Sequence, residues 1–289
     1  MGEVQRFLAK ETLKSVHKEM RGHRPPLALF NYDLIGRHMV CDGFYELALL
    51  ECLENHVFPR LTSRKLCLDI GANVGNHSAF FAPFFDRTIA FEPNLRALKL
   101  LEANAMLFDN IEPRNYGLSS AEGTAIASYN SASVGAASIS IDREGEFTTE
   151  FHLKRLDDVL SEDEKSQVAF MKIDVEGHEL DVLEGARETL NASSPVVVLE
   201  VLPQEIKDGT TEPMKLLQDE GYAHCYTMVD SAPMARRSER LAKLLNTLSV
   251  LFRGRKILEK FELQKLEGGL EQKQYAMIVL SREELPVSS

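Results

Sequence analysis

The stretch 66–75 reads LCLDIGANVG and decides the fold. A short apolar strand pattern ends at Ile70, and the loop that follows carries Gly71, Asn73 and Gly75 before a helix pattern begins. Glycine tolerates a positive φ and lets a ligand approach the main chain closely. In an open α/β sheet, ligands bind at the carboxyl ends of strands near the switch point. This loop is therefore the first predicted binding site.

Strand and helix patterns alternate after this loop. The run of Val and Leu in residues 195–201 is nearly continuous, which indicates burial on both faces, as in a parallel sheet. The alternation predicts an α/β fold with a Rossmann-like, doubly wound sheet. The predicted strands are residues 66–70, 88–91, 111–116, 168–173, 195–201, 223–229 and 275–281, with extra short strands at 123–129, 137–141 and 150–153; the predicted helices are 76–85, 94–108, 156–160, 178–190 and 213–220.

Two regions flank or interrupt this pattern. Residues 1–64 predict an N-terminal helical segment, and residues 65–289 form the α/β domain with a helical insertion at about 231–270. Within the insertion, residues 234–262 combine many Lys and Arg with leucines at helical spacing. We interpret it as a helical hairpin with a solvated basic face, or as a lid, an anionic-substrate surface or a peripheral membrane-surface helix. In the N-terminal segment, the predicted helices are residues 4–20 and 42–55, and residues 59–64 predict a polar linker.

Composition limits the partners and the compartment. The net charge of −11 argues against a general nucleic-acid binder, whose affinity depends on neutralising phosphates. The four cysteines are scattered, without zinc-finger spacing, which favours free thiols in a reducing cytoplasm. The N-terminus shows no signal-peptide pattern, and no apolar run approaches the ~20 residues of a membrane span. We therefore expect a cytoplasmic protein and leave its oligomeric state open.

An acidic residue, Glu92, ends the second predicted strand. About 20 residues after a glycine loop, such a carboxylate can accept hydrogen bonds from both ribose hydroxyls of a nucleoside. A dinucleotide site usually shows GxGxxG, but here Asn73 replaces the second glycine, and Asp69 lies beside the loop. An acid disfavours a pyrophosphate and suits the ammonium and sulfonium of S-adenosylmethionine, directly or through water. The predicted cofactor is therefore S-adenosylmethionine.

Several motifs together carry a family resemblance. LDIGANVGNHSAFFA followed by IAFEPN, then RLDDVL and FMKIDVEGHELDVLEGA, resemble the FkbM-type methyltransferases, and DLIG and GFYE resemble the segment before that family's first strand. The resemblance covers roughly residues 33–200 and implies a class I methyltransferase that methylates a hydroxyl of a sugar, glycan or secondary metabolite. The expected cofactor contacts are Asp69, Gly71, Asn73, Gly75, Asn76, Glu92, Pro93, Leu118 and Asp174.

The candidate catalytic residues follow two buried strands. Asp174, Glu176 and His178 come directly after residues 168–173, and Glu200 ends the strand 195–201. A hydroxyl nucleophile must lose a proton, so a positioned base assists the transfer. Glu176 is alternatively a helix cap, and His178 is either a base or a first-turn helix residue. The acids could instead bind a divalent cation, but the resemblance requires no metal, and we predict none.

Two other functions fit parts of the pattern. A nicotinamide-dependent oxidoreductase shares the sheet and the acidic strand end, although the missing GxGxxG speaks against it. A catalytically inactive protein that still binds S-adenosylmethionine is the third hypothesis. Calorimetry with both cofactors distinguishes the first two, and turnover with a panel of acceptors distinguishes the third.

Overall fold

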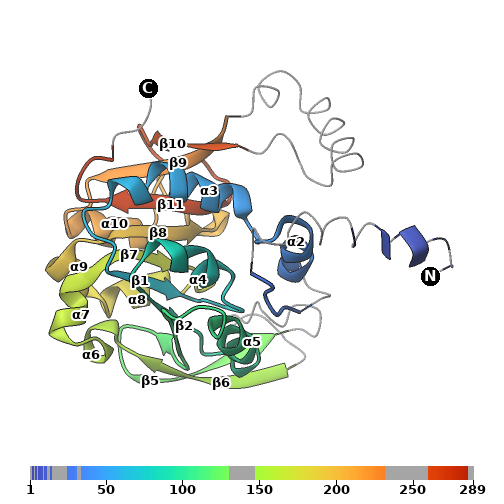
Figure 1. The fold of residues 1–289 in the computed structure, drawn as a ribbon. Helices are drawn as coiled ribbons and strands as arrows, with labels where there is room; N and C mark the ends of the chain where they lie inside the picture. The colour runs from blue at the N-terminus through green and yellow to red at the C-terminus, as the bar shows by residue number, and fades with distance from the viewer. Residues whose placement is uncertain are drawn as a thin grey trace.

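The central sheet has eight strands in the order β10-β9-β11-β8-β7-β1-β2-β3 in the computed structural model (Figure 1). Strands β3, β2, β1, β7 and β8 are parallel, whereas β11 is antiparallel to β8 and β9, and β10 is antiparallel to β9. The order reverses between β1 and β7, which is the switch point of a doubly wound sheet. The predicted α/β fold is confirmed. The strands are β1 Leu66–Ile70, β2 Arg87–Phe91, β3 Ile111–Arg114, β7 Val168–Ile173, β8 Val196–Val201, β9 His224–Asp230, β10 Phe261–Lys265 and β11 Tyr275–Ser281.

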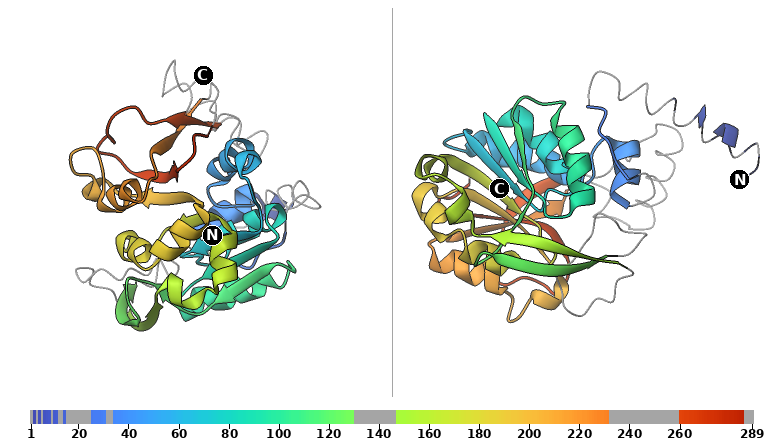
Figure 2. Two further views of the ribbon diagram at one scale, coloured as in Figure 1. Left: turned by 90° about the vertical axis from the view of Figure 1, so that its left-hand side faces the viewer. Right: turned by 90° about the horizontal axis from the view of Figure 1, so that it is seen from below.

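Successive side chains of a strand enter two different apolar clusters, because strand side chains alternate between faces. Leu68 of β1 and Val197 of β8 pack in one cluster, and their neighbours Cys67 and Val198 pack in the other. Helices cover both faces (Figure 2). The first cluster includes residues of α8 (Glu179–Glu184), α9 (Arg187–Ser193) and α10 (Glu212–Asp219), and the second includes residues of α3 (Leu47–His56), η1 (Phe58–Arg60) and α4 (Asn76–Phe81).

A second, three-stranded sheet follows the last parallel strand of the first half. Its order is β4-β6-β5, formed by β4 Gly117–Leu118, β5 Gly123–Tyr129 and β6 Phe147–Lys154. The predicted strand 123–129 is confirmed, and the predicted strand 150–153 lies within β6. The predicted strand 137–141 lies outside the described residues. The remaining elements are η2 Ala82–Phe84, α5 Leu95–Ala105, α6 Leu156–Val159, α7 Glu162–Gln167 and η3 Pro203–Glu205.

The structure describes scattered residues between 2 and 14, and then residues 25–30, 34–129, 147–231 and 260–285. Those of the predicted helix 4–20 that are described are helical. The predicted single helix 42–55 is wrong in its first turn: α2 (Leu34–Asp42) ends there, and α3 begins only at Leu47. Gly43 and Glu46 adopt left-handed backbone conformations, with φ of 88° and 57°, which interrupt the helix.

The predicted helical insertion at 231–270 lies mostly outside the described residues. Its end is a correction, because Phe261–Lys265 forms strand β10 and pairs antiparallel with β9. Leu263 is buried while Glu262 and Gln264 are exposed, so this short stretch has the two-residue period of a strand. The stretch overlaps the end of the basic and leucine-rich residues 234–262, which placed it within the predicted helical insertion.

None of the helices within the described ranges combines the length and the apolar character that a membrane crossing requires.

Phe58 connects the N-terminal segment to the sheet. Its ring is 1% exposed and lies 5.9 Å from Phe81 and 5.3 Å from Phe170, both in near-perpendicular contacts. We expect Phe58→Ala to lower the free energy of unfolding by about 3–5 kcal/mol, because it leaves a cavity in this cluster. Urea denaturation measures the loss. The half-exposed Leu107 provides a control, since Leu107→Ala should change stability by only about 0.5 kcal/mol. Equal losses in the two variants would contradict the prediction.

Candidate functional site

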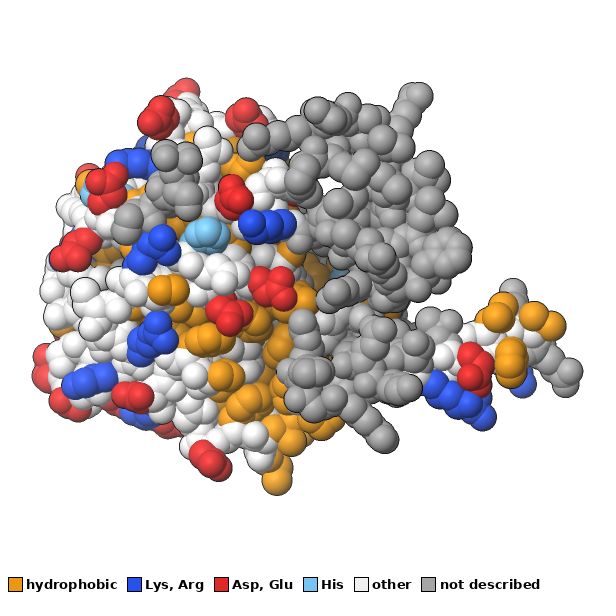
Figure 3. All heavy atoms as spheres, turned by 45° about the horizontal axis from the view of Figure 1, so that its top comes forward, with side chains coloured by type: hydrophobic (Ala, Val, Ile, Leu, Met, Phe, Trp, Pro, Cys, Tyr) orange, Lys and Arg blue, Asp and Glu red, His pale blue; other side chains and the backbone are white. Residues whose placement is uncertain are grey.

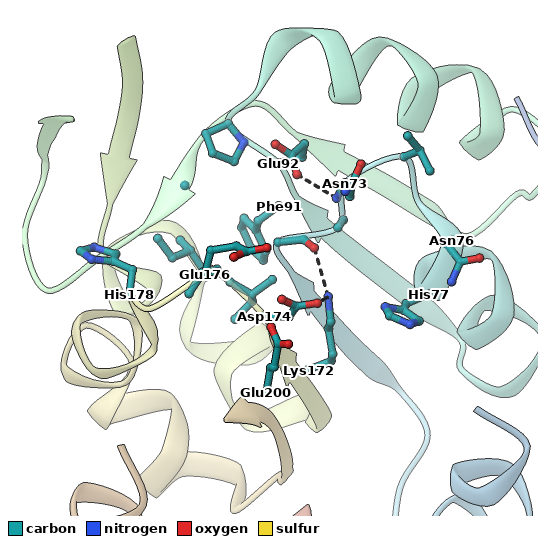
Figure 4. Close-up of a pocket in the computed structure, with 18 of the residues that line it drawn as sticks. Asn73, Asn76, His77, Phe91, Glu92, Lys172, Asp174, Glu176, His178 and Glu200 are labelled. Atoms are coloured by element: carbon teal, nitrogen blue, oxygen red, sulfur yellow. Dashed lines mark hydrogen bonds and ion pairs between the residues drawn. The ribbon is translucent and has the colours of Figure 1, made fainter. Parts of the chain in front are cut away.

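A cavity lies at the carboxyl ends of β1, β2, β7 and β8, beside the switch point (Figure 4). It brings together most of the residues expected from the sequence. Asp69 and Gly75 are exceptions, because neither lines the cavity wall. The predicted residues that line it are Gly71, Asn73, Asn76, Glu92, Pro93, Leu118, Asp174, Glu176, His178 and Glu200.

The loop after β1 rests directly on the end of β7. Gly71 has a φ of 77°, and a Cβ atom built on it would lie 1.8 Å from the carbonyl oxygen of Asp174. Only glycine fits this approach. The amides of Gly71 and Ala72 both donate to the carbonyl of Phe91, at 3.1 and 3.0 Å, which ties the loop to β2 as well. Gly75 serves packing instead, since its missing side chain makes room for Leu101 of α5.

Glu92 is held in place at the end of β2. Its side chain is buried, and its two oxygens accept hydrogen bonds from the amides of Asn73 at 2.8 Å and Asn94 at 2.7 Å. Burial raises the pKa of Glu92 to about 7, although these hydrogen bonds partly oppose the rise. The carboxyl group is therefore fixed on the cavity wall with acceptor capacity left for a ligand hydroxyl.

Asp69 lies behind the wall rather than on it. Its carboxylate is fully buried, accepts a 2.5 Å hydrogen bond from the Ser78 hydroxyl and lies 3.4 Å from Nζ of Lys172. The predicted direct contact between Asp69 and a cofactor does not fit this placement. Its charge instead compensates the buried ammonium of Lys172, which sequence reasoning missed. A lysine within an otherwise apolar strand was the available signal, because lysine is almost never buried without a partner.

The carboxyl groups of Asp174 and Glu200 face each other on the cavity wall and form a carboxyl pair (Figure 4). Burial opposes ionisation of Asp174, but the Lys172 ammonium, His77 and the neighbouring Glu200 lower its pKa below the ordinary value. Burial and the charge of Asp174 raise the pKa of Glu200 to about 8. The two shifts have opposite directions and favour Asp174 as the charged member of the pair. Gln274 donates to the second side of Glu200 at 2.9 Å.

The turn after Asp174 is shaped by two left-handed residues. Glu176 and Gly177 have φ values of 56° and 97°. The buried Glu179 stabilises this turn, since its carboxyl oxygen accepts hydrogen bonds from the amides of Val175 at 3.2 Å and Gly177 at 3.1 Å. Burial raises the pKa of Glu179 to about 7. Glu179 thus holds the turn that precedes α8, whereas Glu176 lines the cavity.

His178 lies on the cavity wall but away from the carboxyl pair, as Figure 4 shows. Its Nε2 is 3.0 Å from the Ser119 hydroxyl, and its Nδ1 is 3.3 Å from a carboxylate oxygen of Asp181. Burial lowers the pKa of His178, and Asp181 only partly offsets this. Its position favours a structural role at the start of α8 over that of a base for the same reaction.

Part of the cavity wall comes from residues that precede the sheet. The Asn76 side chain accepts from the amide of Tyr45 at 2.8 Å and donates to its carbonyl at 3.1 Å. Asn76 therefore holds the main chain of Tyr45, and because it also lines the cavity, its contact with a cofactor stays a prediction. Glu46 lies 3.3 Å from Nε2 of His77. Tyr45, Glu46 and His77 all line the cavity but are not among the site residues predicted from the sequence.

A family model described as the methyltransferase FkbM domain matches residues 69–223, more than half of the 289-residue chain. The chain belongs to the FkbM methyltransferase family. The matched region of this family member includes Glu92, Asp174 and Glu200 and excludes Tyr45 and Glu46. Because the chain belongs to a methyltransferase family, the alternative hypothesis of a nicotinamide-dependent oxidoreductase is set aside.

Individual relatives cover different shares of this methyltransferase. Hexuronic acid methyltransferase AglP of Haloferax volcanii is 30% identical over 167 residues, which are 53% of this chain and 67% of AglP. AMB antimetabolite synthetase AmbE of Pseudomonas aeruginosa is 31% identical over 183 residues, 50% of this chain but only 8% of AmbE. The crystal structure of methyltransferase FkbM from Methylobacillus flagellatus is 17% identical with a TM-score of 0.35, covering 66% of this chain and 47% of that chain.

The raised pKa of Glu200 predicts a pH-dependent stability. The folded protein retains this proton up to about pH 8, whereas the unfolded chain releases it near the ordinary value of 4.5. Stability contributed by the group is therefore complete below about pH 4.5 and is lost as the pH rises through 8. Between pH 5 and 8, the free energy of unfolding should therefore fall in the wild type. In Glu200→Gln it should fall by about 1–2 kcal/mol less than in the wild type, a figure that allows for solvent screening of the partly exposed group.

Urea unfolding at both pH values measures this difference. Glu92 and Glu179 titrate in the same range, but they are present in both proteins and cancel. The exposed Glu184→Gln is the matched control and should follow the wild-type pH dependence. Parallel pH curves for the wild type and Glu200→Gln would show that Glu200 is not protonated in the fold.

Proposed function

We propose that this protein transfers a methyl group from S-adenosylmethionine to a hydroxyl of a sugar, glycan or secondary metabolite. One observation carries the proposal: a fixed, buried carboxyl at the end of β2, Glu92, and the carboxyl pair Asp174–Glu200 face the same cavity. The first group suits a nucleoside, and the second suits a hydroxyl that loses its proton during transfer.

The residues present fit the cofactor. Glu92 would accept hydrogen bonds from the ribose hydroxyls, and the apolar Pro93 and Leu118 would face the adenine. Asp174 and Glu176 place negative charge on the same wall, where an ammonium group is favoured. When bound, S-adenosylmethionine supplies an electrophilic methyl group for transfer to the acceptor oxygen.

The chain's own groups then act on the acceptor. The side chain of Asp174 is 34% exposed to the cavity and is the charged member of the pair. It would accept a hydrogen bond from the acceptor hydroxyl and orient the oxygen, and it would take up the proton as the new bond forms. Glu200, protonated, would donate to Asp174 and hold it in place.

The acceptor class is supported by relatives. AglP is named as a hexuronic acid methyltransferase, which favours a sugar, and AmbE as an antimetabolite synthetase, which favours a secondary metabolite. Peripheral membrane contact through the basic insertion remains a prediction, because residues 232–259 lie outside the described ranges. We also propose that the methyl acceptor is not a nucleic acid, as the net charge of −11 suggests.

Cofactor choice is tested by calorimetry. The wild type should bind S-adenosylhomocysteine, and Glu92→Ala should weaken binding by about 1–3 kcal/mol through loss of hydrogen bonds to a charged group. The exposed Glu122→Ala is the control and should bind normally. Circular dichroism verifies the fold, since the variant removes the acceptor of two backbone amides. Binding of NADH without binding of S-adenosylhomocysteine would refute the cofactor assignment.

Catalysis is tested by single-turnover measurement at saturating cofactor with an acceptor found by screening. Asp174→Asn keeps the size of the side chain and removes its charge, so the rate should fall by ~100-fold or more. Glu200→Gln should have a milder effect, and His178→Ala the smallest, because its ring lies away from the pair. Normal turnover by Asp174→Asn together with an inactive His178→Ala would reverse these roles. Cofactor binding without turnover of any acceptor would favour an inactive binding protein.

A further inference from the structure

Lys172 is a buried ammonium at the junction of three chain segments. It lies in β7 two residues before Asp174, and its side chain is 4% exposed. Its Nζ lies 3.4 Å from Oδ1 of Asp69 in β1 and 3.2 Å from Oδ2 of Asp174, and it donates to the carbonyl of Gly71 at 3.0 Å. A charge removed from water to this extent is retained only with such partners.

We propose that Lys172 is a positioning residue that determines which carboxyl of the Asp174–Glu200 pair carries the negative charge. Two neighbouring carboxyls cannot both ionise readily, because their like charges repel, so we expect the pair to hold one proton. The ammonium is in contact with Asp174, and this contact stabilises the charge there and leaves the proton on Glu200. Figure 4 shows the three side chains pointing toward one another.

The other charged groups around the pair do not replace this role. Among the described residues that line the cavity, Lys172 is the only lysine or arginine. His77 of α4 adds a weaker stabilisation of the Asp174 charge, but it is also paired with Glu46. Gln274 donates to Glu200 and lowers its pKa, but burial and the charge of Asp174 outweigh this bond. The remaining neighbours are acidic or neutral: Glu46, Asp69, Glu176 and Tyr45.

Lys172 connects the carboxyl pair to the loop after β1. The ammonium that fixes Asp174 also holds the carbonyl of Gly71, in the loop expected to contact the cofactor. Asp69, bound to Ser78, holds the ammonium from the opposite side. The meaning for catalysis rests on the proposed function, whereas the charge states belong to the protein alone and are measured without cofactor or acceptor.

The experiment is a pH titration of the side-chain carboxyl carbons by NMR in protein labelled with ¹³C at Asp and Glu carboxyls. Asp174→Asn and Glu200→Gln assign the two signals. In the wild type, Asp174 should remain a carboxylate from pH 5 to 8 while Glu200 titrates late. In Lys172→Met, the midpoint of the Asp174 titration should rise by about 1 pH unit or more, because the stabilising charge is gone.

A second buried lysine provides the matched control. Lys165 is 5% exposed and pairs with Glu162 and Glu188, which do not line the cavity. Lys165→Met should lower stability and leave the Asp174 titration unchanged. If Lys172→Met fails to fold because Asp69 is left unpaired, Asp69→Asn/Lys172→Met removes both charges. The Asp174 titration of this double variant is then compared with that of the single variant Asp69→Asn. The midpoint in the double variant should be higher by the same amount.

An Asp174 titration that is the same with and without Lys172 in a folded variant would overturn the proposal and make the lysine purely structural. Binding of S-adenosylhomocysteine to the wild type is measured separately. Failure of that binding would refute the proposed function and leave the carboxyl titration to decide the role of Lys172.

Discussion

The contact between Gly71 and the carbonyl oxygen of Asp174 is the constraint on which the site depends. No other side chain fits, because its first carbon would lie 1.8 Å from that oxygen. The amide of Asp174 also donates to the carbonyl of Ile70 at 3.1 Å, so the ends of β1 and β7 are joined directly. As a result, the loop that holds Glu92 through the amide of Asn73 lies in the same cavity as the acidic pair.

The buried charges beside the cavity contribute little net stability. Replacing buried ion pairs by apolar side chains is often neutral or stabilising, so a lysine and two aspartates at the centre of a sheet require another reason. In the role proposed for Lys172, the reason is the separation of two proton affinities: the pKa of Asp174 is lowered while that of Glu200 is raised to about 8. Neighbouring carboxyls whose environments separate their proton affinities in this way take different roles in acid–base chemistry.

The sequence was sufficient where the signal was local. Strands β1, β5, β7 and β11 have the predicted bounds, because apolar runs or turn residues delimit them. Glu92, Asp174 and Glu200 were found because strand ends converge at the switch point. The rest depends on tertiary contacts. Strand β10 was hidden beside a basic helical pattern, and the role of Asn76 depends on Tyr45, 31 residues earlier. The residues around Asn76 give no local pattern that predicts its contact with Tyr45.

The amide of Asn76 binds the peptide groups of Tyr45, not its ring. The bond therefore fixes the path of the chain along this part of the cavity without specifying which side chain stands at position 45. Positions 45 and 46 both line the cavity. An evolving or engineered variant can thus exchange the side chain of Tyr45, and with it the shape and polarity of the cavity wall, while the peptide backbone keeps its anchor. The choice at position 46 is narrower, because its φ of 57° is left-handed.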